Sequence, residues 1–536
     1  MKLREAELTN NKIWEEAGFE LPKFDRNKMV ENTKENPQWI HFGGGNIFRA
    51  FPAAVCQDLL NRGIIDTGII VAEGYDYEII EKSYNAYDNL NVLVTLKKDG
   101  NLDKKVIGSI AEALCVDTAN EKHWNRLKEI FTNKSLKMAS FTITEKGYSL
   151  VNGKGELLKD VESDFKKVPS SATSYIGKLT ALLYERFKNG KTPLTLVSMD
   201  NCSHNGTKLE NAINTFTKAW VDNKLVEEDF LNYVKEDVSY PWSMIDKITP
   251  RPAQSVIEML NKIGFEDTAL VTTSKNTYIS CFVNAEEPQY LVIEDNFKNG
   301  RIPLDKGGII YADKETVDKV EKMKVCTCLN PLHTALAVYG CLLSHDKISD
   351  EMKDKELVNL IKNIGYKEAL PVVVNPKIIS PNDFIDEVIN VRFPNPFMPD
   401  TPQRIACDTS QKIGIRFGET IKAYIKAEDL DVKSLEYIPL AIAGWCRYLM
   451  AIDDRGNNFE LSPDPLLSSL TPIISKVKME SEENVHEALS EILTKESIFG
   501  VDLYKVGLGE KIENYFKELI ASKGSVRETL KKYTSK

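Results

Sequence analysis

A glycine-rich turn stands between the first predicted strand of the chain, residues 38–42, and a predicted helix over residues 50–60. The turn residues are, in order, Gly43, Gly44, Gly45, Asn46 and Ile47. Glycines permit a tight turn and a close approach of the backbone, and a helix N-terminus directs N–H groups at a pyrophosphate. Because Phe48 stands where the G-x-G-x-x-G pattern requires its third glycine, the turn alone fits an ordinary glycine-rich loop equally well.

A carboxylate follows the next predicted strand. Residues 68–72 form a β-branched run, and Glu73 comes directly after it, 30 residues beyond Gly43. A carboxylate at this position can accept hydrogen bonds from both ribose hydroxyls of an adenosine, and it repels a 2′-phosphate. The strand, the glycine turn, the helix and the second strand with its acidic end together predict a dinucleotide site that prefers NAD.

A second segment, residues 321–333, carries side chains that suit proton transfer at a substrate oxygen: Lys324, Asn330 and His333. A proline follows Asn330, which fits an N-cap and the first helical position, so the pattern predicts a new helix there and an end of the preceding helix near residue 326. Such a break brings together side chains that a continuous helix would place on opposite faces. Periodicity alone equally allows a surface lysine, a capping asparagine and a core histidine.

The cysteine and histidine residues lack the spacing of a metal site. The nine cysteines are scattered, and the single tight pair, Cys326 and Cys328, has no second pair to complete a zinc knuckle. The six histidines form no HExxH pattern. We therefore expect no metal. An odd number of scattered cysteines is typical of reduced thiols in the cytoplasm.

Composition excludes several classes of partner. The 536 residues contain 69 Lys and Arg against 79 Asp and Glu, a net charge of −10, which disfavours binding to nucleic acid or to an anionic membrane. We find no apolar run long enough to span a bilayer, and no apolar signal segment at the N-terminus. The expected partner is a small molecule in the cytoplasm, and no protein partner is inferred.

The elements that must hold these residues change in character along the chain. Strand-like and helix-like segments alternate over the first 300 residues, including strands at 138–144 and 194–198, a helix at 174–189, and a hairpin that joins runs at 91–96 and 105–110. Helical periodicity dominates afterwards, at 314–325, 331–344, 352–364, 416–428, 435–452 and 508–522. The pattern predicts an α/β N-terminal domain with a largely parallel sheet, residues 1–305, and a mostly α-helical C-terminal domain, residues 306–536.

Six motifs occur in an order that resembles the polyol-specific long-chain dehydrogenases, the mannitol dehydrogenase family. They are HFGGGNIFRAF at 41–51, TITEKGY at 142–148, SMDNCSHNG at 198–206, DKITP at 246–250, EKMKVCTCLNPLH at 321–333 and RIACDTSQK at 404–412. The resemblance implies a Rossmann-type N-terminal domain, a helical C-terminal domain, NAD as the cofactor and a metal-independent mechanism.

The resemblance also implies a role for each matching residue. Lys324 matches the family's acid/base, and Asn201 and Asn330 match the amides that hold the reacting oxygen. His333 and Asp246 match substrate-binding residues of the family. Arg404 and Lys412 match its distal basic pair, and Glu321 matches a carboxylate that gates proton exchange. The family more often has one residue fewer between the lysine and the first asparagine, which keeps Lys322 as an alternative to Lys324.

The ending of the glycine turn points to one branch of this family. It reads IFRAF, which is closer to tagaturonate reductases than to the FHRAH of mannitol enzymes. The resemblance therefore implies NAD-dependent reduction of a keto-hexuronate, fructuronate to mannonate, and the reverse oxidation. Tagaturonate reductase and mannitol 2-dehydrogenase remain the enzymatic alternatives. A dinucleotide-binding regulatory protein without turnover is the alternative from another class.

Overall fold

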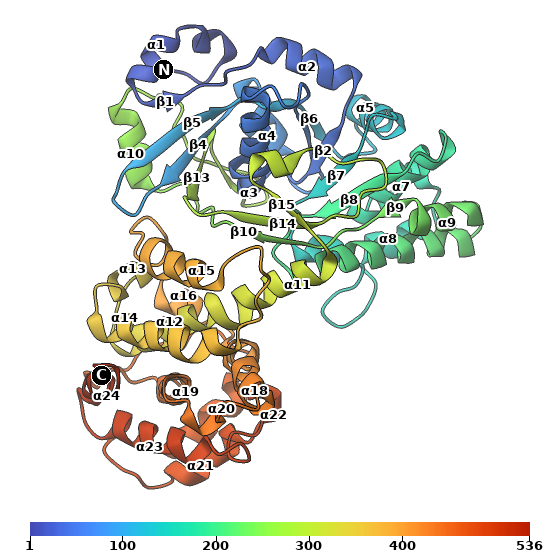
Figure 1. Cartoon of the computed structure of the whole chain (residues 1–536). Helices are drawn as coiled ribbons and strands as arrows, with labels where there is room; N and C mark the ends of the chain where they lie inside the picture. The colour runs from blue at the N-terminus through green and yellow to red at the C-terminus, as the bar shows by residue number, and fades with distance from the viewer. Residues whose placement is uncertain (536) are drawn as a thin grey trace. The chain divides into compact units, whose positions relative to one another are not determined.

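The computed structural model describes residues 1–535 and divides the chain into two compact units (Figure 1). The first unit comprises Met1–Lys97 and Asn101–Asp318. The second comprises Lys98–Gly100 and the chain from Lys319 onward. The change of unit thus falls between Asp318 and Lys319, thirteen residues after the domain boundary that the sequence predicted.

A six-stranded parallel sheet organises the first unit. Its strands are β2 (Trp39–Phe42), β3 (Ile69–Glu73), β6 (Ile110–Cys115), β7 (Met138–Phe141), β8 (Leu194–Ser198) and β9 (Val238–Ser239). They lie in the order β6-β3-β2-β7-β8-β9, and every neighbouring pair is parallel. Counted along the chain, this order is 3-2-1-4-5-6, which is the arrangement of dinucleotide-binding sheets. The strand order reverses between β2 and β7, where such sheets bind their ligands.

Apolar side chains bury both faces of this sheet. On one face Ile40, Ile70 and Ala139 join a core with α5 (Glu121–Thr132), α7 (Tyr175–Lys188) and α8 (Asn205–Asp222). On the other face Val71 and Met138 join a core with α4 (Pro52–Asn61). Because successive side chains of a strand point to opposite faces, these runs are apolar at nearly every position. The predicted parallel sheet is confirmed, and it carries helices on both faces.

The remaining helices of the first unit are α1 (Asn11–Glu16), α2 (Arg26–Glu35), α3 (Asn46–Ala50), α6 (Lys159–Asp164), α9 (Glu228–Glu236) and α10 (Gln254–Lys262). The predicted helix over 50–60 is in fact α3 and α4, which Phe51 separates, because Pro52 begins the second of them. The predicted helix over 174–189 is α7, and the Ser174 hydroxyl caps it by accepting the Gly177 N–H.

Smaller sheets complete the first unit. One has the order β1-β5-β4-β13, from Phe19–Glu20, Leu102–Ile107, Asn91–Leu96 and Phe282–Glu286. The predicted hairpin is confirmed as β4 and β5, which are antiparallel, but its second strand ends at Ile107 and a separate strand begins at Ile110. The others join β10 (Ser243–Asp246), β14 (Tyr290–Glu294) and β15 (Ile310–Ala312), and β11 (Val271–Thr272) with β12 (Tyr278–Ile279).

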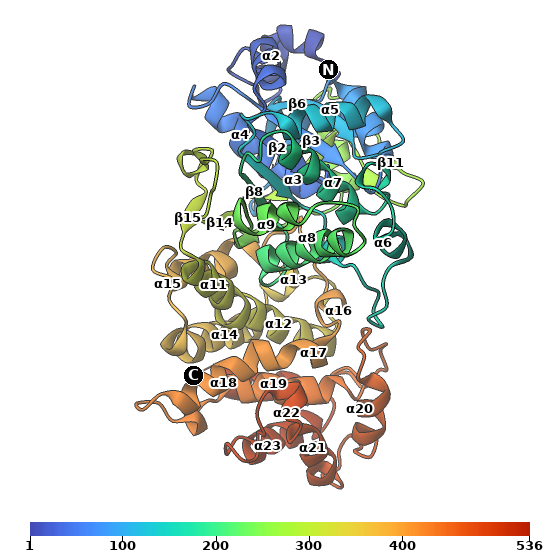
Figure 2. The same ribbon diagram turned by 90° about the vertical axis from the view of Figure 1, so that its right-hand side faces the viewer.

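The second unit is helical over the part of the chain that the structure describes (Figure 2). Each of the six predicted C-terminal helices overlaps an observed one. The helices from the unit boundary onward are α11 (Lys314–Lys322), α12 (Asn330–Leu342), α13 (Ile348–Glu351), α14 (Lys355–Lys362), α15 (Pro381–Glu387), α16 (Pro402–Ile405), α17 (Thr409–Ile413), α18 (Glu419–Lys426), α19 (Tyr437–Tyr448), α20 (Leu467–Ile474), α21 (Val485–Leu493), α22 (Glu496–Phe499), α23 (Gly509–Ile520) and α24 (Ser525–Thr534). The predicted fold class, an α/β unit followed by a mostly helical one, is confirmed.

Helix α12 lies at the centre of the second unit and packs against α19. Gly444 on α19 allows this close contact, because a Cβ there would lie 2.6 Å from the Tyr339 ring. The helical stretch Lys314–Leu342, which includes α12, is long and apolar enough by composition to cross a membrane, with a mean hydropathy of 1.3. However, 72% of that apolar window is buried inside the fold, as in the core helix of a globular protein.

Candidate functional site

The glycine turn has a conformation that only glycine adopts readily. Gly43 has φ +105°, and a Cβ at this position would collide with the carbonyl oxygen of Thr142. Its N–H donates to the Ala72 carbonyl at 2.8 Å, which ties the turn to β3. The turn therefore sits at the carboxyl end of β2, against both β3 and β7, at the point where the strand order reverses.

Glu73 is buried beneath this turn and has a role that the sequence did not reveal. One carboxylate oxygen accepts the Gly44 N–H at 2.8 Å. The other accepts the N–H groups of Tyr75 at 2.8 Å and Asp76 at 3.2 Å. Glu73 thus fixes the turns that follow β2 and β3, in addition to facing the cavity described below.

The residues after the turn begin α3. A Cβ at Gly45 would meet no atom within 4 Å, so the backbone is open to a ligand here. Asn46 and Ile47 are the first residues of α3. The buried Arg49 donates to the Asn46 side-chain oxygen at 2.9 Å and to the Ser280 carbonyl at 2.6 Å, which holds this short helix in place.

A cavity of about 600 Å³ lies at the carboxyl ends of β2, β3 and β7. Its lining includes Gly43, Gly45, Glu73, Asp76 and the loop after β7. The volume is in the range of small-molecule and cofactor sites. Open glycine backbone, two carboxylates and the position at the reversal of strand order fit the pyrophosphate and ribose of a dinucleotide.

Asp200, which the sequence did not single out, holds the loop that forms one wall of this cavity. Its carboxylate accepts the backbone N–H groups of Ile143 at 2.9 Å and Thr144 at 2.8 Å, and the Tyr148 hydroxyl at 2.5 Å. Burial raises the pKa of Asp200 above its usual value, and these hydrogen bonds oppose that rise. Asp200 therefore positions the loop after β7 and the chain immediately before Asn201.

The other predicted residues of the first unit lie near the ends of strands. Asn201 follows β8 at the carboxyl edge of the sheet and is exposed. Asp246 is the last residue of β10, and its side chain is buried. Both residues make interactions within the protein.

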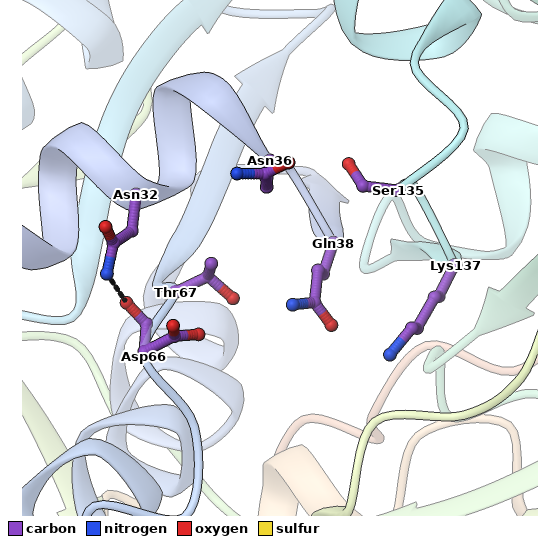
Figure 3. Close-up of a pocket in the computed structure, with 7 residues that line it drawn as sticks. All are labelled: Asn32, Asn36, Gln38, Asp66, Thr67, Ser135 and Lys137. Atoms are coloured by element: carbon purple, nitrogen blue, oxygen red, sulfur yellow. Dashed lines mark hydrogen bonds between the residues drawn. The ribbon is translucent and has the colours of Figure 1, made fainter.

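A second pocket, of about 310 Å³, lies at the opposite edge of the sheet (Figure 3). Gln38 and Lys137 line it at the beginnings of β2 and β7, with Asn32 and Asp66 nearby. The Asn32 amide donates to the Asp66 carbonyl at 3.2 Å. None of the predicted site residues lies in this pocket, which agrees with the binding of ligands at the carboxyl ends of parallel strands.

In the second unit, Lys324 lies in a π-helical segment, η7 (Met323–Cys328), between α11 and α12. The Leu329 N–H donates to the Lys324 carbonyl at 3.1 Å, five residues back, and the Lys324 side chain is buried. A π-helical turn accommodates one residue more than an α-helical turn, and such turns are frequent at functional sites. This turn can accommodate the extra residue expected between Lys324 and Asn330, and it lies where the sequence predicted an interruption of the helix. Glu321 is on α11, just before this turn.

Asn330 and His333 lie in the first turn of α12. Asn330 is the first helical residue and not the predicted cap, because Leu329 occupies the capping position without a side-chain bond. Burial, together with the nearby guanidinium groups of Arg416, Arg404 and Arg392, lowers the pKa of His333 to about 3. The buried His333 Nε2 makes no hydrogen bond and lies 3.7 Å from a carboxylate oxygen of Asp400.

The two residues of the predicted distal basic pair, Arg404 and Lys412, have different partners. Arg404 forms an ion pair with Asp400, so the structure brings Arg404 and His333 to the same carboxylate. Lys412, on α17, donates to the Cys407 carbonyl at 2.9 Å and lies 3.8 Å from the Asp408 carboxylate.

Within residues 1–535, no cluster of three or more His, Cys, Asp or Glu side chains has the arrangement of a metal site. The nine cysteines are all free thiols. The chemistry that these residues can supply is hydrogen bonding, ion pairing and proton transfer.

A Rossmann-type unit followed by a helical unit is an architecture that solved dehydrogenase structures also have. Two solved structures share this fold. The substrate-free form of a D-sorbitol dehydrogenase has a TM-score of 0.81 and 24% identity, over 98% of this chain and 99% of that one. The ternary complex of Pseudomonas fluorescens mannitol 2-dehydrogenase with NAD and D-mannitol has a TM-score of 0.69 and 24% identity, over the whole of both chains.

Sequence comparison establishes the family. Residues 37–306 match the Mannitol dehydrogenase Rossmann domain, and residues 316–520 match the Mannitol dehydrogenase C-terminal domain. The D-mannonate oxidoreductase of Thermotoga maritima is 53% identical over 532 residues, 99% of this chain and 98% of that protein. The polyol:NADP oxidoreductase of Gluconobacter oxydans is 27% identical over 83% of this chain and 86% of its own length. The chain belongs to the mannitol dehydrogenase family and is an oxidoreductase, as the six motifs predicted.

Proposed function

We propose that this chain catalyses the NAD-dependent reduction of D-fructuronate to D-mannonate and the reverse oxidation. The observation that carries the proposal is the 53% identity, over nearly the whole of both chains, to the D-mannonate oxidoreductase of Thermotoga maritima. Three relatives named mannitol 2-dehydrogenase are 26–28% identical, and the D-mannonate oxidoreductase of Escherichia coli is 25% identical, so among these relatives only the Thermotoga maritima protein favours one activity over the other.

In this proposal the first unit binds the cofactor. Gly43, Gly44 and Gly45 receive the pyrophosphate together with Asn46 and Ile47 at the beginning of α3. Glu73 accepts the ribose hydroxyls, and its charge disfavours a 2′-phosphate. The nicotinamide cofactor, when bound, supplies the hydride that reduces the ketone carbon. The cavity at these residues, and the open backbone at Gly45, support this assignment.

The proton comes from a side chain of the second unit. The Lys324 ammonium donates a proton to the ketone oxygen as the carbonyl is reduced, and neutral Lys324 takes it back from the alcohol in the reverse direction. The Asn201 and Asn330 amides donate hydrogen bonds to that oxygen as it gains negative charge. Glu321, one helical turn before Lys324, exchanges the proton with solvent.

The remaining residues bind the substrate chain. His333 is neutral over the physiological pH range because its pKa is lowered to about 3, so it takes part as a hydrogen-bonding group and not as a cation. Asp246, Arg404 and Lys412 also bind the substrate. The free thiols of the chain support the cytoplasm as its location.

The test is NADH oxidation with D-fructuronate, D-tagaturonate and D-fructose, measured side by side. We expect the highest kcat/KM for D-fructuronate. A higher value for D-tagaturonate would assign the chain to the epimeric acid, and a higher value for D-fructose would make it a polyol dehydrogenase. No oxidation with any of the three would favour a binding protein without turnover.

A further inference from the structure

Arg416 is a partly buried cation of the second unit that has no acidic partner. It lies in the π-helical segment η11 (Gly414–Gly418) and donates to the Thr334 hydroxyl at 2.5 Å. Burial lowers its pKa to about 10, and no carboxylate of residues 1–535 forms an ion pair with it. A guanidinium group carries five N–H donors, and its removal from water is costly unless an anion or several acceptors receive them.

Two other buried arginines of the chain, Arg186 and Arg447, are satisfied by backbone carbonyls. Arg186 donates to five backbone carbonyls, and Arg447 donates to three. Beside His333, Arg404 is paired with Asp400, and Arg392 has interactions of its own. Arg416 differs from these four side chains because its one hydrogen-bond acceptor in the described chain is a neutral hydroxyl.

The segment that carries Arg416 is closely packed, and it lies against the segments that carry Lys324 and His333. Gly414 and Gly418 lie so close to α22 that a Cβ at either position would collide with the carbonyl oxygen of Ile498 or Phe499. The segment η11 also packs against η7, which carries Lys324, and against α12. Thr334, which receives the Arg416 hydrogen bond, directly follows His333, and the charge of Arg416 contributes to the lowered pKa of His333.

We propose that Arg416 binds the carboxylate of the substrate. A guanidinium group donates two parallel hydrogen bonds to a carboxylate, which supplies both the missing counter-charge and the missing acceptors. An open-chain keto-hexuronate carries its ketone and its carboxylate on one short carbon chain, so a cation on a segment that packs against those of Lys324 and Asn330 can contact the carboxylate while these two residues act on the ketone. Arg416 then selects sugar acids over neutral polyols. This inference rests on the proposed function, and it identifies the group that determines substrate class.

The test compares Arg416→Met with Lys426→Met, a control that removes one positive charge from the exposed end of α18. Initial rates with NADH are measured for D-fructuronate and for D-fructose. We expect Arg416→Met to lower kcat/KM for D-fructuronate about 10²-fold, mainly through KM, the size expected for a lost charge-assisted hydrogen-bond pair. The rate constant for D-fructose should change less than about threefold by the same reasoning, and the control should leave both unchanged.

Two further variants separate binding from structural support. Arg416→Lys keeps the charge and should recover part of the loss, and Thr334→Val removes the hydroxyl partner and should keep the preference for the sugar acid. An equal loss for both substrates in Arg416→Met, or a loss of the preference in Thr334→Val, would overturn the inference. If Arg416→Met does not fold, Arg416→Lys and Thr334→Val decide the question in the same assay.

A binding measurement distinguishes failure of this inference from failure of the proposed function. Thermal unfolding of the wild type is followed with D-mannonate, D-altronate or D-mannitol in the presence of NAD. We expect stabilisation by the sugar acids that Arg416→Met abolishes. If the wild type reduces no keto-hexuronate but keeps this Arg416-dependent stabilisation, the proposed function fails and the inference stands. Equal stabilisation of wild type and variant overturns the inference alone.

Discussion

The glycine turn of the first unit and the beginning of α12 in the second unit treat their buried polar groups in opposite ways. At the turn, the Glu73 carboxylate accepts three backbone N–H groups, so the protein itself satisfies the charge. Around α12, the His333 Nε2 makes no hydrogen bond and Arg416 makes one. Buried polar groups are normally paired, so those around α12 are shaped for a partner that the chain does not supply.

Pairing by the backbone and pairing by a ligand have different effects on the stability of the protein and on binding. A charge satisfied by the backbone stabilises one conformation of the turn whether or not a ligand is bound. A buried guanidinium group with one neutral partner lowers the stability of the folded protein, because its lost hydration is not replaced. An anionic ligand that pairs with the group restores this loss of free energy on binding. The glycine turn is therefore preorganised by its own hydrogen bonds, whereas in our proposal the surroundings of α12 are completed by the substrate.

Removal of the proposed proton donor should have the largest effect. Lys324→Ala should lower kcat by about 10²–10⁴-fold or more, the usual contribution of positioned proton transfer. Binding of NADH should be nearly unchanged, because the proposed cofactor residues lie in the first unit. Stopped-flow turnover and fluorescence titration of NADH measure the two quantities.

Lys322→Ala is the matched control, since Lys322 ends α11 just before the π-helical segment. Lys322→Ala should leave kcat nearly unchanged. A severe defect in Lys322→Ala combined with a mild one in Lys324→Ala would shift the assignment of the acid/base by two residues.

Removal of the charge at Glu73 should have an intermediate effect. Glu73→Gln keeps the size and one acceptor oxygen but removes the negative charge that repels a 2′-phosphate. We expect kcat/KM for NADH to fall about 10-fold, about the contribution of one charge-assisted hydrogen bond, and that for NADPH to rise. Glu81→Gln, an exposed carboxylate on the segment Ile80–Tyr84, is the control.

The structure also predicts an effect of Glu73→Gln on thermal stability. Because the carboxylate holds the turns after β2 and β3, the thermal midpoint should fall as well. A lower midpoint without any gain in NADPH use would show that Glu73 acts through the backbone alone, and the predicted preference for NAD would then need another cause.

The parts of the fold that the sequence predicted are those whose signal is local. Residues 69–72 are a continuous apolar run, residues 194–198 are mostly apolar, and α7 has a serine cap and an apolar stripe. The short strands after residue 240 were not predicted, because they consist of two to five residues and depend on distant partners. Strand β13, for example, pairs with β4 some 190 residues earlier in the chain.

The candidate site shows the same division. The motif spacing predicted an extra residue between Lys324 and Asn330, but only the coordinates show the π-helical turn that can accommodate it. Glu73 was found as a carboxylate after a strand, whereas its hydrogen bonds to the backbone depend on tertiary structure. Arg416 gave no signal in the sequence, since one arginine in a helical pattern is typical of a solvated face. The glycines four residues apart on either side of it are the feature that could have indicated a close approach.

The smallest expected effect concerns Glu351 of the second unit, a buried carboxyl group that contrasts with Glu73. Neither of its oxygens has a hydrogen-bond partner, and it lies against the backbone of Gly340, where no side chain intervenes. Burial, together with the charges of Asp354 and Asp350, raises the pKa of Glu351 well above 4.5.

The folded protein therefore keeps a proton on Glu351 at pH values where the unfolded chain has lost it. Since the unfolded state then binds fewer protons, the free energy of unfolding falls as pH rises above about 4.5, by about 1.4 kcal/mol per pH unit, until the pKa of the folded state is reached. Glu351→Gln, which is neutral at all pH values, should remove this slope and raise the thermal midpoint at pH 8 by a few degrees, with little change at pH 5. Thermal unfolding between pH 5 and pH 8, with the exposed Glu428→Gln as control, measures it. An unchanged slope in Glu351→Gln would mean that Glu351 is ionised in the folded protein, and that the second unit satisfies this carboxylate as the first unit satisfies Glu73.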